Sequence, residues 1–207
     1  MPAIGSIGDV RKLFLLSPAR VAGARAGLLL NPHAPFALAR TFHSSGLPLD
    51  EVFTFTSGLY FRGKIAYARH FAAPEGAIRV ITSNKGLLPP DTMLDPQRMK
   101  AFGEDDIDES NPRYRRPLER DARELAKALA SDGVAILLGS IATPKYRDVL
   151  LHAFGDRLLF PAEFVGRGDM SRGALLLRHA RSGEELQYIS VRGAVFRGKR
   201  AKRVGEV

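Results

Sequence analysis

Short apolar runs alternate along the chain with segments whose apolar residues recur every three or four positions. Continuous apolar runs are typical of strands buried on both faces, and the wider spacing is typical of amphipathic helices. The predicted strands are Val10–Leu16, Ile78–Thr82, Val134–Leu138 and Leu158–Phe160, with Gln187–Val191 as an edge strand. The predicted helices are Pro35–Phe42, a segment beyond Arg62, Leu118–Leu129, Tyr146–Phe154 and Ala174–Arg178. Strands separated by helices predict an α/β fold with a mainly parallel sheet flanked by helices.

The length of 207 residues suits one domain. We assign residues 10–191 to a single compact α/β domain and residues 192–207 to a flexible basic tail. Positions 91–117 are polar and interrupted by prolines, which predicts a long surface excursion with one helical turn near Gln97–Phe102.

Composition excludes several classes of protein. The chain has no cysteine, so it has no disulfide framework, no thiolate nucleophile and no zinc–thiolate site. No apolar run approaches the roughly 18 residues that a membrane span requires. We therefore expect a cytoplasmic protein without a membrane partner.

The formal net charge of +9 is concentrated at one end of the chain. The last 17 residues carry a net charge of +5, and their cations include Arg197, Lys199, Arg200, Lys202 and Arg203. A basic segment of this kind binds polyphosphate without reading sequence, although it also serves simply to keep a protein soluble. The acidic run Glu104–Glu109 is typical of a solvated loop; the alternative, a metal or partner site, lacks a nearby histidine.

The segment Arg157–His179 contains a strand, a glycine-rich loop and the start of a helix. Its glycines stand at positions 166, 168 and 173, among Arg167, Asp169, Ser171 and Arg172. Free backbone N–H groups and a helix dipole can face an anion there, with Asp169 or Ser171 as the helix cap. The alternative is a tight connection with solvated arginines. The loop fits neither of the common glycine-rich nucleotide-binding motifs.

Several predicted strands end in loops of small polar residues. These loops are Ser17-Pro18, Ser83-Asn84-Lys85-Gly86, Gly139-Ser140 and the loop after Phe160. Ligands of open α/β sheets bind outside the carboxyl ends of the strands, so parallel strands would bring these loops to one face.

Phosphate or base recognition is the chemistry that these loops suit best, because arginine forks and lysine charges bind phosphate. The candidate residues are Ser57, Gly58, Tyr60, Arg62, Lys64, Ser83, Lys85, Gly86, Gly139, Ser140, Gly166, Arg167, Gly168, Ser171 and Arg172. Tyr60, Phe61 and Phe164 are candidates for stacking on a base, with burial in the core as the alternative for the two phenylalanines.

Candidates for acid–base chemistry are few. Asp169 and Glu163 lie on one loop and are the catalytic candidates, although Asp169 is also a candidate helix cap. The five histidines have no metal-ligand spacing, and His70, His152 and His179 fall on predicted helices as partly exposed residues. We expect neither a metal nor a cofactor.

The order of the segments resembles the YaaA-like superfamily, named for a bacterial peroxide-stress protein, and related domains associated with archaeosine and deazaguanine modification enzymes. The matching pieces are Leu15–Ala19, Ser57–Phe61, Val80–Asp91, Leu137–Ser140 with Tyr146, and Phe160-Pro161 with its glycine loop. This resemblance implies an α/β fold and an association with nucleic acid or its bases, through DNA binding, stress protection or base modification.

Three functions follow as hypotheses. The first is binding of DNA or RNA through loop cations and the basic tail. The second is an enzyme that acts on a nucleobase, nucleoside or nucleotide in a pocket at the strand ends, with Lys85 or Arg167 stabilising charge. The third is a protein-interaction module that uses the acidic run and the tail.

Overall fold

The sheet has six strands in the order β4-β3-β1-β6-β7-β8, and its four central strands are parallel. The computed structural model describes residues 10–72 and 77–194. The strands are β4 (Leu87–Leu88), β3 (Ile78–Ile81), β1 (Lys12–Leu16), β6 (Val134–Leu138), β7 (Leu158–Pro161) and β8 (Tyr188–Ser190). At the two edges, β4 and β8 run antiparallel to their neighbours. The α/β fold with a mainly parallel sheet is thus confirmed, and Pro161 ends its strand as predicted.

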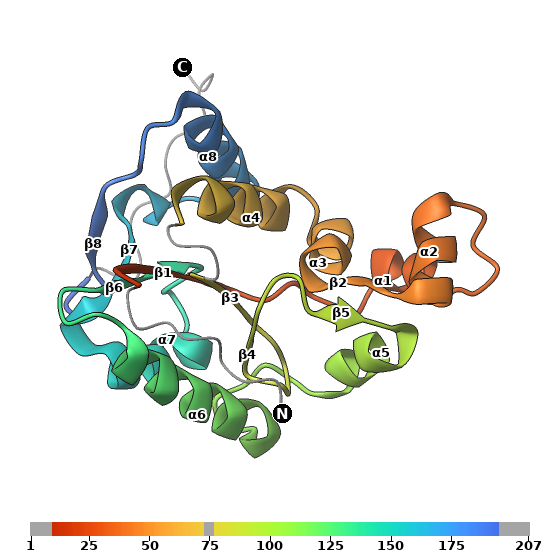
Figure 1. Ribbon diagram of the computed structural model, residues 1–207, viewed down its shortest axis with the longest axis horizontal. Coiled ribbons are helices and arrows are strands. Elements are labelled where there is room, and N and C mark those ends of the chain that lie inside the picture. Colours follow the sequence, from red (N-terminus) through yellow and green to blue (C-terminus); the bar gives the residue numbers. More distant parts are fainter. Residues whose placement is uncertain (1–9, 73–76, 195–207) are drawn as a thin grey trace.

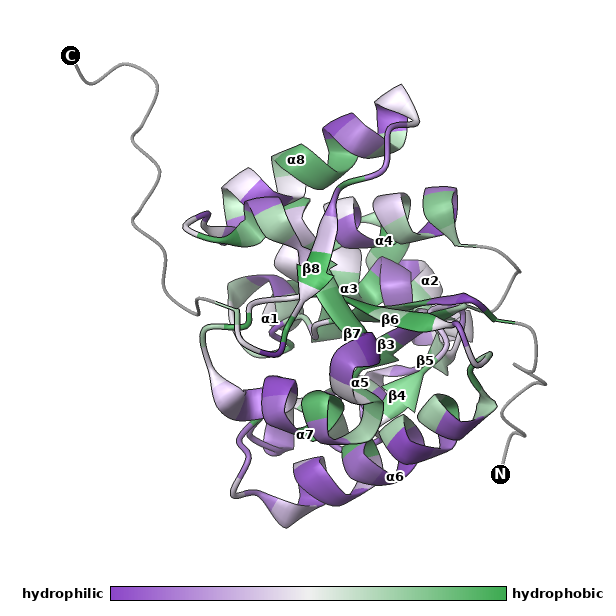
Figure 2. Cartoon of the chain, turned by 90° about the vertical axis from the view of Figure 1, so that its left-hand side faces the viewer, coloured by the Kyte–Doolittle hydropathy of each residue, from purple (hydrophilic) through white to green (hydrophobic). Residues whose placement is uncertain are grey.

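Helices cover both faces of the sheet in one compact body (Figure 1). One face carries α4 (Leu59–Phe71) and α8 (Asp169–Ser182), and the other carries α6 (Pro112–Ala128) and α7 (Pro144–Phe154). To the right in Figure 1 lie α1 (Ala24–Leu30), α2 (Ala37–Ser45), α3 (Leu49–Ser57) and α5 (Pro96–Glu104), with a small antiparallel sheet of β2 (Leu47–Pro48) and β5 (Met93–Leu94). Figure 2 shows the hydrophilic side of α6 turned away from the sheet. Across residues 10–72 and 77–194, no helix has both the length and the apolar character to cross a membrane.

Positions 91–117 contain two helices and a short strand, so the prediction of a long excursion with one helical turn was wrong. Two of the prolines there mark helix starts, whereas Pro117 lies inside α6. Pro96 and Pro112 each occupy the first helical position, where a missing N–H costs nothing. Asp95 caps α5 by accepting from the Arg98 amide at 2.8 Å, and Asn111 caps α6 by accepting from the Arg113 amide at 3.0 Å. As a result, α6 begins six residues before the predicted Leu118.

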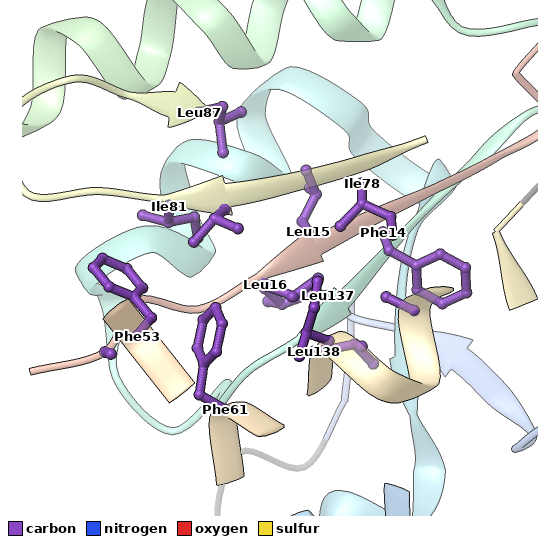
Figure 3. Close-up of a cluster of buried hydrophobic side chains, with 14 of the residues drawn as sticks. Phe14, Leu15, Leu16, Phe53, Phe61, Ile78, Ile81, Leu87, Leu137 and Leu138 are labelled. Atoms are coloured by element: carbon purple, nitrogen blue, oxygen red, sulfur yellow. The ribbon is translucent and has the colours of Figure 1, made fainter. Parts of the chain in front are cut away.

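Apolar side chains of the parallel strands form the core together with helix side chains. Figure 3 shows Phe53 of α3 and Phe61 of α4 beside the leucines of β1 and β6. The rings of Phe53 and Phe61 meet edge to face, with centroids 5.3 Å apart. Both phenylalanines are buried and pack in the core.

The helices α4 and α8 approach one another backbone to backbone. A Cβ on Gly63 would lie 2.6 Å from the carbonyl oxygen of Gly173, and a Cβ on Gly173 would lie 2.8 Å from the carbonyl oxygen of Leu59. Lys64 follows Gly63 in α4, and Asp169 is the first residue of α8. Because the two helices pack this closely, both residues lie near the same end of the sheet.

The predicted edge strand is confirmed as β8, which pairs with β7. Described residues continue to Ala194, and Arg192 there forms an ion pair with Asp156 at 2.7 Å. The tail cations at 197, 199, 200, 202 and 203 lie outside the described residues, so the flexible tail stays a prediction.

Candidate functional site

Three parallel strands end near serines that line a single pocket. Ser17 directly follows β1, and Ser83 and Ser140 come two residues after β3 and β6. The pocket has a volume of about 970 Å³. After the fourth strand, β7, the loop residues do not line the pocket, and only Asp169, the first residue of α8, does. The predicted convergence on one face is therefore confirmed for the loops after β1, β3 and β6, whereas the glycine loop after β7 does not line the pocket.

Helices, the segment after β1 and the segment between α5 and α6 supply the remaining wall. The other lining residues include Phe53 and Ser57 from α3, Tyr60 from α4, Lys145 and Tyr146 from α7, and Arg20 from the segment after β1. Of the residues predicted to contact phosphate or a base, the pocket contains Ser57, Tyr60, Ser83 and Ser140, and it also contains the catalytic candidate Asp169.

The acidic segment forms part of the pocket wall. Glu104, Asp105, Asp106 and Asp108 line it. Asp105 is buried, with one carboxylate oxygen 3.1 Å from Nε of Arg113 and the other accepting from Nδ2 of Asn84 at 2.8 Å. These two contacts anchor the segment to the start of α6 and to the turn after β3. The prediction of a solvated loop was therefore wrong for Asp105, although Glu104, Asp106 and Asp108 are exposed.

Lys64 lies against Ser17 and donates two hydrogen bonds to it. Its Nζ is 2.5 Å from the backbone oxygen of Ser17 and 2.9 Å from Oγ. The side chain is buried, and Nζ lies 4.5 Å from the ring centroid of Tyr60 and 4.8 Å from that of Phe61. Within the described residues, Lys64 has no ion-pair partner. The sequence-based role as a surface phosphate ligand is thus wrong, because the ammonium group is covered by rings and occupied by Ser17.

The environment of Lys64 favours its neutral form. Burial lowers the pKa of Lys64 from 10.5 to about 7, whereas the charge of Asp169 acts to raise it. An amine with this pKa exchanges a proton near neutral pH. Such an amine next to a pocket hydroxyl is a candidate for proton transfer.

Tyr146 joins Ser17 to Ser140. Its hydroxyl accepts a hydrogen bond from the amide of Ser140 at 2.9 Å and interacts with the side chain of Ser17. Burial raises the pKa of Tyr146, which keeps the hydroxyl protonated. A Cβ on Gly139 would lie 2.9 Å from both Ser17 Cβ and the Tyr146 hydroxyl oxygen. Gly139 therefore allows this close approach and does not itself line the pocket.

The hydroxyl of Tyr60 is buried, and the side chain of Arg172 is its hydrogen-bonding neighbour. Burial raises the pKa of Tyr60, against the effect of the nearby Arg172 guanidinium, which acts to lower it. Because Tyr60 lines the pocket, its hydroxyl is a donor available to a ligand.

The glycine loop after β7 is built differently from the predicted anion site. Arg172 donates from Nε and Nη2 to the backbone oxygen of Phe164, at 3.2 Å and 3.0 Å, and pairs with Asp169 at 3.6 Å. Arg167 donates to Oγ of Ser171 at 3.2 Å. Gly168 is the N-cap of α8, with no side-chain hydrogen bond, and Asp169 is the first helical residue. The predicted cap by Asp169 or Ser171 was therefore wrong. The loop residues before Asp169 do not line the pocket.

The remaining predicted residues serve turns or face solvent. Gly58 and Gly86 have φ values of 66° and 68°, which glycine adopts readily, and they form the α3–α4 junction and the turn before β4. Arg62, Lys85 and Glu163 are exposed and away from the pocket lining.

The aromatic candidates divide in the same way. Phe61 and Phe164 are buried at 0% and 1% exposure, so neither presents a face to a base, and only Tyr60 reaches the pocket.

Histidines and metal ligands do not contribute to the site. His70, His152 and His179 lie on α4, α7 and α8 and are exposed or half-buried, as predicted. In the described part of the chain, no group of three or more histidine, aspartate or glutamate side chains is arranged to hold a metal ion.

The sequence candidates omitted several lining residues. Ser17 stood at a predicted strand end and could have been chosen by the same rule that selected Ser83 and Ser140. Arg20 and Lys145 follow strand-end loops by three and five residues, and nothing in their local pattern separates them from other surface cations.

The pocket combines three kinds of chemistry. Its floor holds hydroxyls next to an amine that titrates near neutrality, its walls carry phenolic donors, and one side carries carboxylates. Comparison of the chain with protein-family models, with curated proteins and with solved structures gives no match.

Proposed function

We propose that the chain is an enzyme that binds a nucleobase or nucleoside in the strand-end pocket and acts on it there. The observation that carries this proposal is the pocket itself. It unites serines from three strand ends with Tyr60, Tyr146 and Asp169, in a volume of about 970 Å³. Pockets of roughly 300–1,000 Å³ with a few converging polar groups bind ligands of this size.

The charges of the pocket select among the possible ligands. Its described lining has two cationic side chains, Arg20 and Lys145, and five carboxylates, at positions 104, 105, 106, 108 and 169. Carboxylates accept hydrogen bonds from ring N–H groups and sugar hydroxyls, but they repel phosphates. A base or nucleoside therefore fits better than a nucleoside triphosphate.

The resemblance to YaaA-like proteins supports the same ligand class, because it implies an association with nucleic acid or its bases. The pocket adds a reason to favour a small ligand. Two predicted loop cations are already engaged, Lys64 by Ser17 and Arg172 by Phe164 and Asp169, and neither is free for a phosphate backbone.

The test is a titration of the full chain with adenine, guanine, their nucleosides and the matching triphosphates, followed by calorimetry. We expect nucleosides to bind at least about tenfold more tightly than triphosphates, which corresponds to about 1.4 kcal/mol. Asp106→Asn should weaken nucleoside binding, whereas Asp132→Asn, an exposed aspartate outside the pocket lining, should not. Tighter binding of triphosphates, or no binding of any ligand, would reject the proposal.

Catalysis is tested separately by chromatography of the bound nucleoside after incubation. We expect conversion by the native chain and its loss in Asp169→Asn. Binding without conversion would reduce the pocket to a binding site and reject the enzymatic part of the proposal.

The distribution of charge favours a second function, binding of DNA or RNA. More than half of the formal charge of +9 lies in the last 17 residues. We propose that this segment gives salt-sensitive, weakly specific affinity. A salt series should show steep loss of affinity for the full chain and little affinity for a chain ending at Val191. Equal affinity of the two chains would contradict a role for the tail.

A further inference from the structure

We propose that Ser17 and Lys64 form a nucleophile–base pair, which makes the pocket floor a site of acyl transfer to water from a carboxylic ester or amide. This inference goes beyond the proposed function and does not depend on which ligand fills the pocket. It assigns to Lys64 a role that differs from phosphate binding.

The first observation is the contact between the two residues. Nζ of Lys64 is 2.9 Å from Oγ of Ser17, within the range in which a base takes a proton directly. Ser17 lines the pocket, and Lys64 is 1% exposed behind it. Ser17 itself is 5% exposed, so a substrate in the pocket meets Ser17 and not the amine.

The second observation is that this buried lysine has no ion-pair partner among the described residues. Within residues 10–72 and 77–194, Lys64 donates hydrogen bonds to Ser17, lies over the rings of Tyr60 and Phe61, and has no ion-pair partner. An unpaired buried ammonium group has a large desolvation penalty. A lysine that only stabilised the fold would therefore be expected to be exposed or to form an ion pair. The desolvation penalty favours the neutral amine, which is the form that can act as a base.

The charged and titratable groups around the pair come from three helices. Asp169 of α8 acts to raise the pKa of Lys64, Tyr60 lies on the same helix as Lys64, and Tyr146 of α7 contacts Ser17 from the other side. Burial outweighs Asp169 and lowers the pKa of Lys64 to about 7. About half of the lysines are then neutral at pH 7 and able to accept a proton.

The reaction uses water as its second reactant. Oγ of Ser17 forms a bond to the carbonyl carbon while its proton passes to Nζ of Lys64. The bond from that carbon to the alcohol or amine leaving group breaks, and Lys64 returns the proton to the leaving group. Water then attacks the acyl carbon, gives one proton to Lys64 and releases the carboxylic acid, and the proton on Lys64 returns to Oγ. Pairs of serine and lysine perform this chemistry on unrelated folds.

Tyr60 supplies the group that stabilises the intermediate. Tyr60 lines the pocket, its buried hydroxyl lies beside the Arg172 side chain, and burial raises its pKa and keeps it protonated. A preorganised donor of this kind stabilises the oxygen on which negative charge develops.

The experiment treats the full chain with a fluorophosphonate, which modifies activated serines, and maps the adduct by mass spectrometry. We expect one adduct, on Ser17, and none in Ser17→Ala. The matched control is Ser44→Ala, which removes an exposed serine of α2. This variant should still be modified on Ser17, as the native chain is. Modification of other serines alone, or no modification, would overturn the proposal while leaving nucleoside binding untouched.

The role of Lys64 is tested by the rate of modification. In Lys64→Met the rate should fall by about a hundredfold or more, whereas Lys127→Met, an exposed lysine of α6, should leave it unchanged. For the native chain, the rate should rise about tenfold per pH unit below pH 7 and level off above it. This profile decides the matter even if Lys64→Met fails to fold. A flat profile, or an unchanged rate in a folded Lys64→Met, would overturn the assignment of Lys64 as the base.

Discussion

Gly63 and Gly173 face one another across the contact between α4 and α8, and a Cβ on Gly63 would lie 2.6 Å from the carbonyl oxygen of Gly173. The atom in the way belongs to the backbone, so it cannot move aside as a side-chain tip would. We expect Gly63→Ala to lower the free energy of unfolding by about 1–3 kcal/mol, as overpacking does. Gly27→Ala is the control, because Gly27 is also helical and a Cβ there meets nothing within 4 Å. It should be neutral or stabilising by up to about 1 kcal/mol. Urea unfolding of both variants checks the prediction, and equal stabilities would contradict the close contact.

The buried Lys64 predicts a dependence of stability on pH. Its pKa is about 7 in the folded chain and 10.5 when exposed, so between these values the unfolded chain binds a proton that the folded chain does not. Stability therefore rises with pH across this window, by up to about 1.4 kcal/mol per pH unit from this group. Below pH 7 both states are protonated and this slope disappears.

Lys64→Met should remove that slope. Denaturant unfolding of the native chain and the variant at pH 6, 8 and 10 measures the difference. The variant should be the more stable of the two at pH 6, and its advantage should shrink toward pH 10. A constant difference at all three values would show that Lys64 is charged or neutral in both states.

Tyr60 predicts opposite changes in stability and in binding. Its buried hydroxyl makes no regular hydrogen bond, so Tyr60→Phe should leave the free energy of unfolding unchanged or raise it by up to about 1 kcal/mol. The same change should weaken ligand binding, because the pocket loses a donor.

Tyr114→Phe provides the comparison for Tyr60→Phe. Among the described residues, Tyr114 also has a buried hydroxyl without a hydrogen-bond partner, and Tyr114 does not line the pocket. Its removal should affect stability in the same direction and leave binding intact. Loss of binding in both variants would indicate a general effect on the fold.

Removal of the Asp121 side chain should lower the free energy of unfolding by leaving a backbone amide unpaired. Its Oδ2 accepts from the backbone N–H of Leu87 at 2.9 Å and lies where a Cβ on residue 86 would stand. Asp121→Ala leaves that buried donor unsatisfied and should cost about 1–3 kcal/mol. The exposed Asp132, paired with Arg11 at 3.8 Å, provides the control, and Asp132→Ala should cost less than about 1 kcal/mol in the same unfolding assay.

Local pattern was enough to predict the four central strands, because each is a nearly continuous apolar run and parallel strands are buried on both faces. The two-residue strands β2, β4 and β5 were not predicted. The same rule predicted where Ser83 and Ser140 meet, since the carboxyl ends of parallel strands share an edge. The sequence did not reveal that Asp105 is buried, because its partners Asn84 and Arg113 stand 21 and 8 residues away.

The role of Lys64 was also hidden from local pattern. Its contact with Ser17 spans 47 residues and depends on the placement of α4 beside the end of β1. A lysine on an amphipathic helix is ordinarily a solvated cation, so only the tertiary fold distinguishes this one. In the same way, the sequence predicted Arg172 to be a phosphate ligand, whereas in the fold it donates to the backbone oxygen of Phe164.

The sheet ends on both sides in very short strands, two residues in β4 and three in β8, each reversed relative to its neighbour. A border of that length offers a second molecule few backbone groups to pair with. Long flat edge strands allow one copy of a protein to pair with the next and so to form fibrils. The short strands at both edges of this sheet therefore disfavour such pairing.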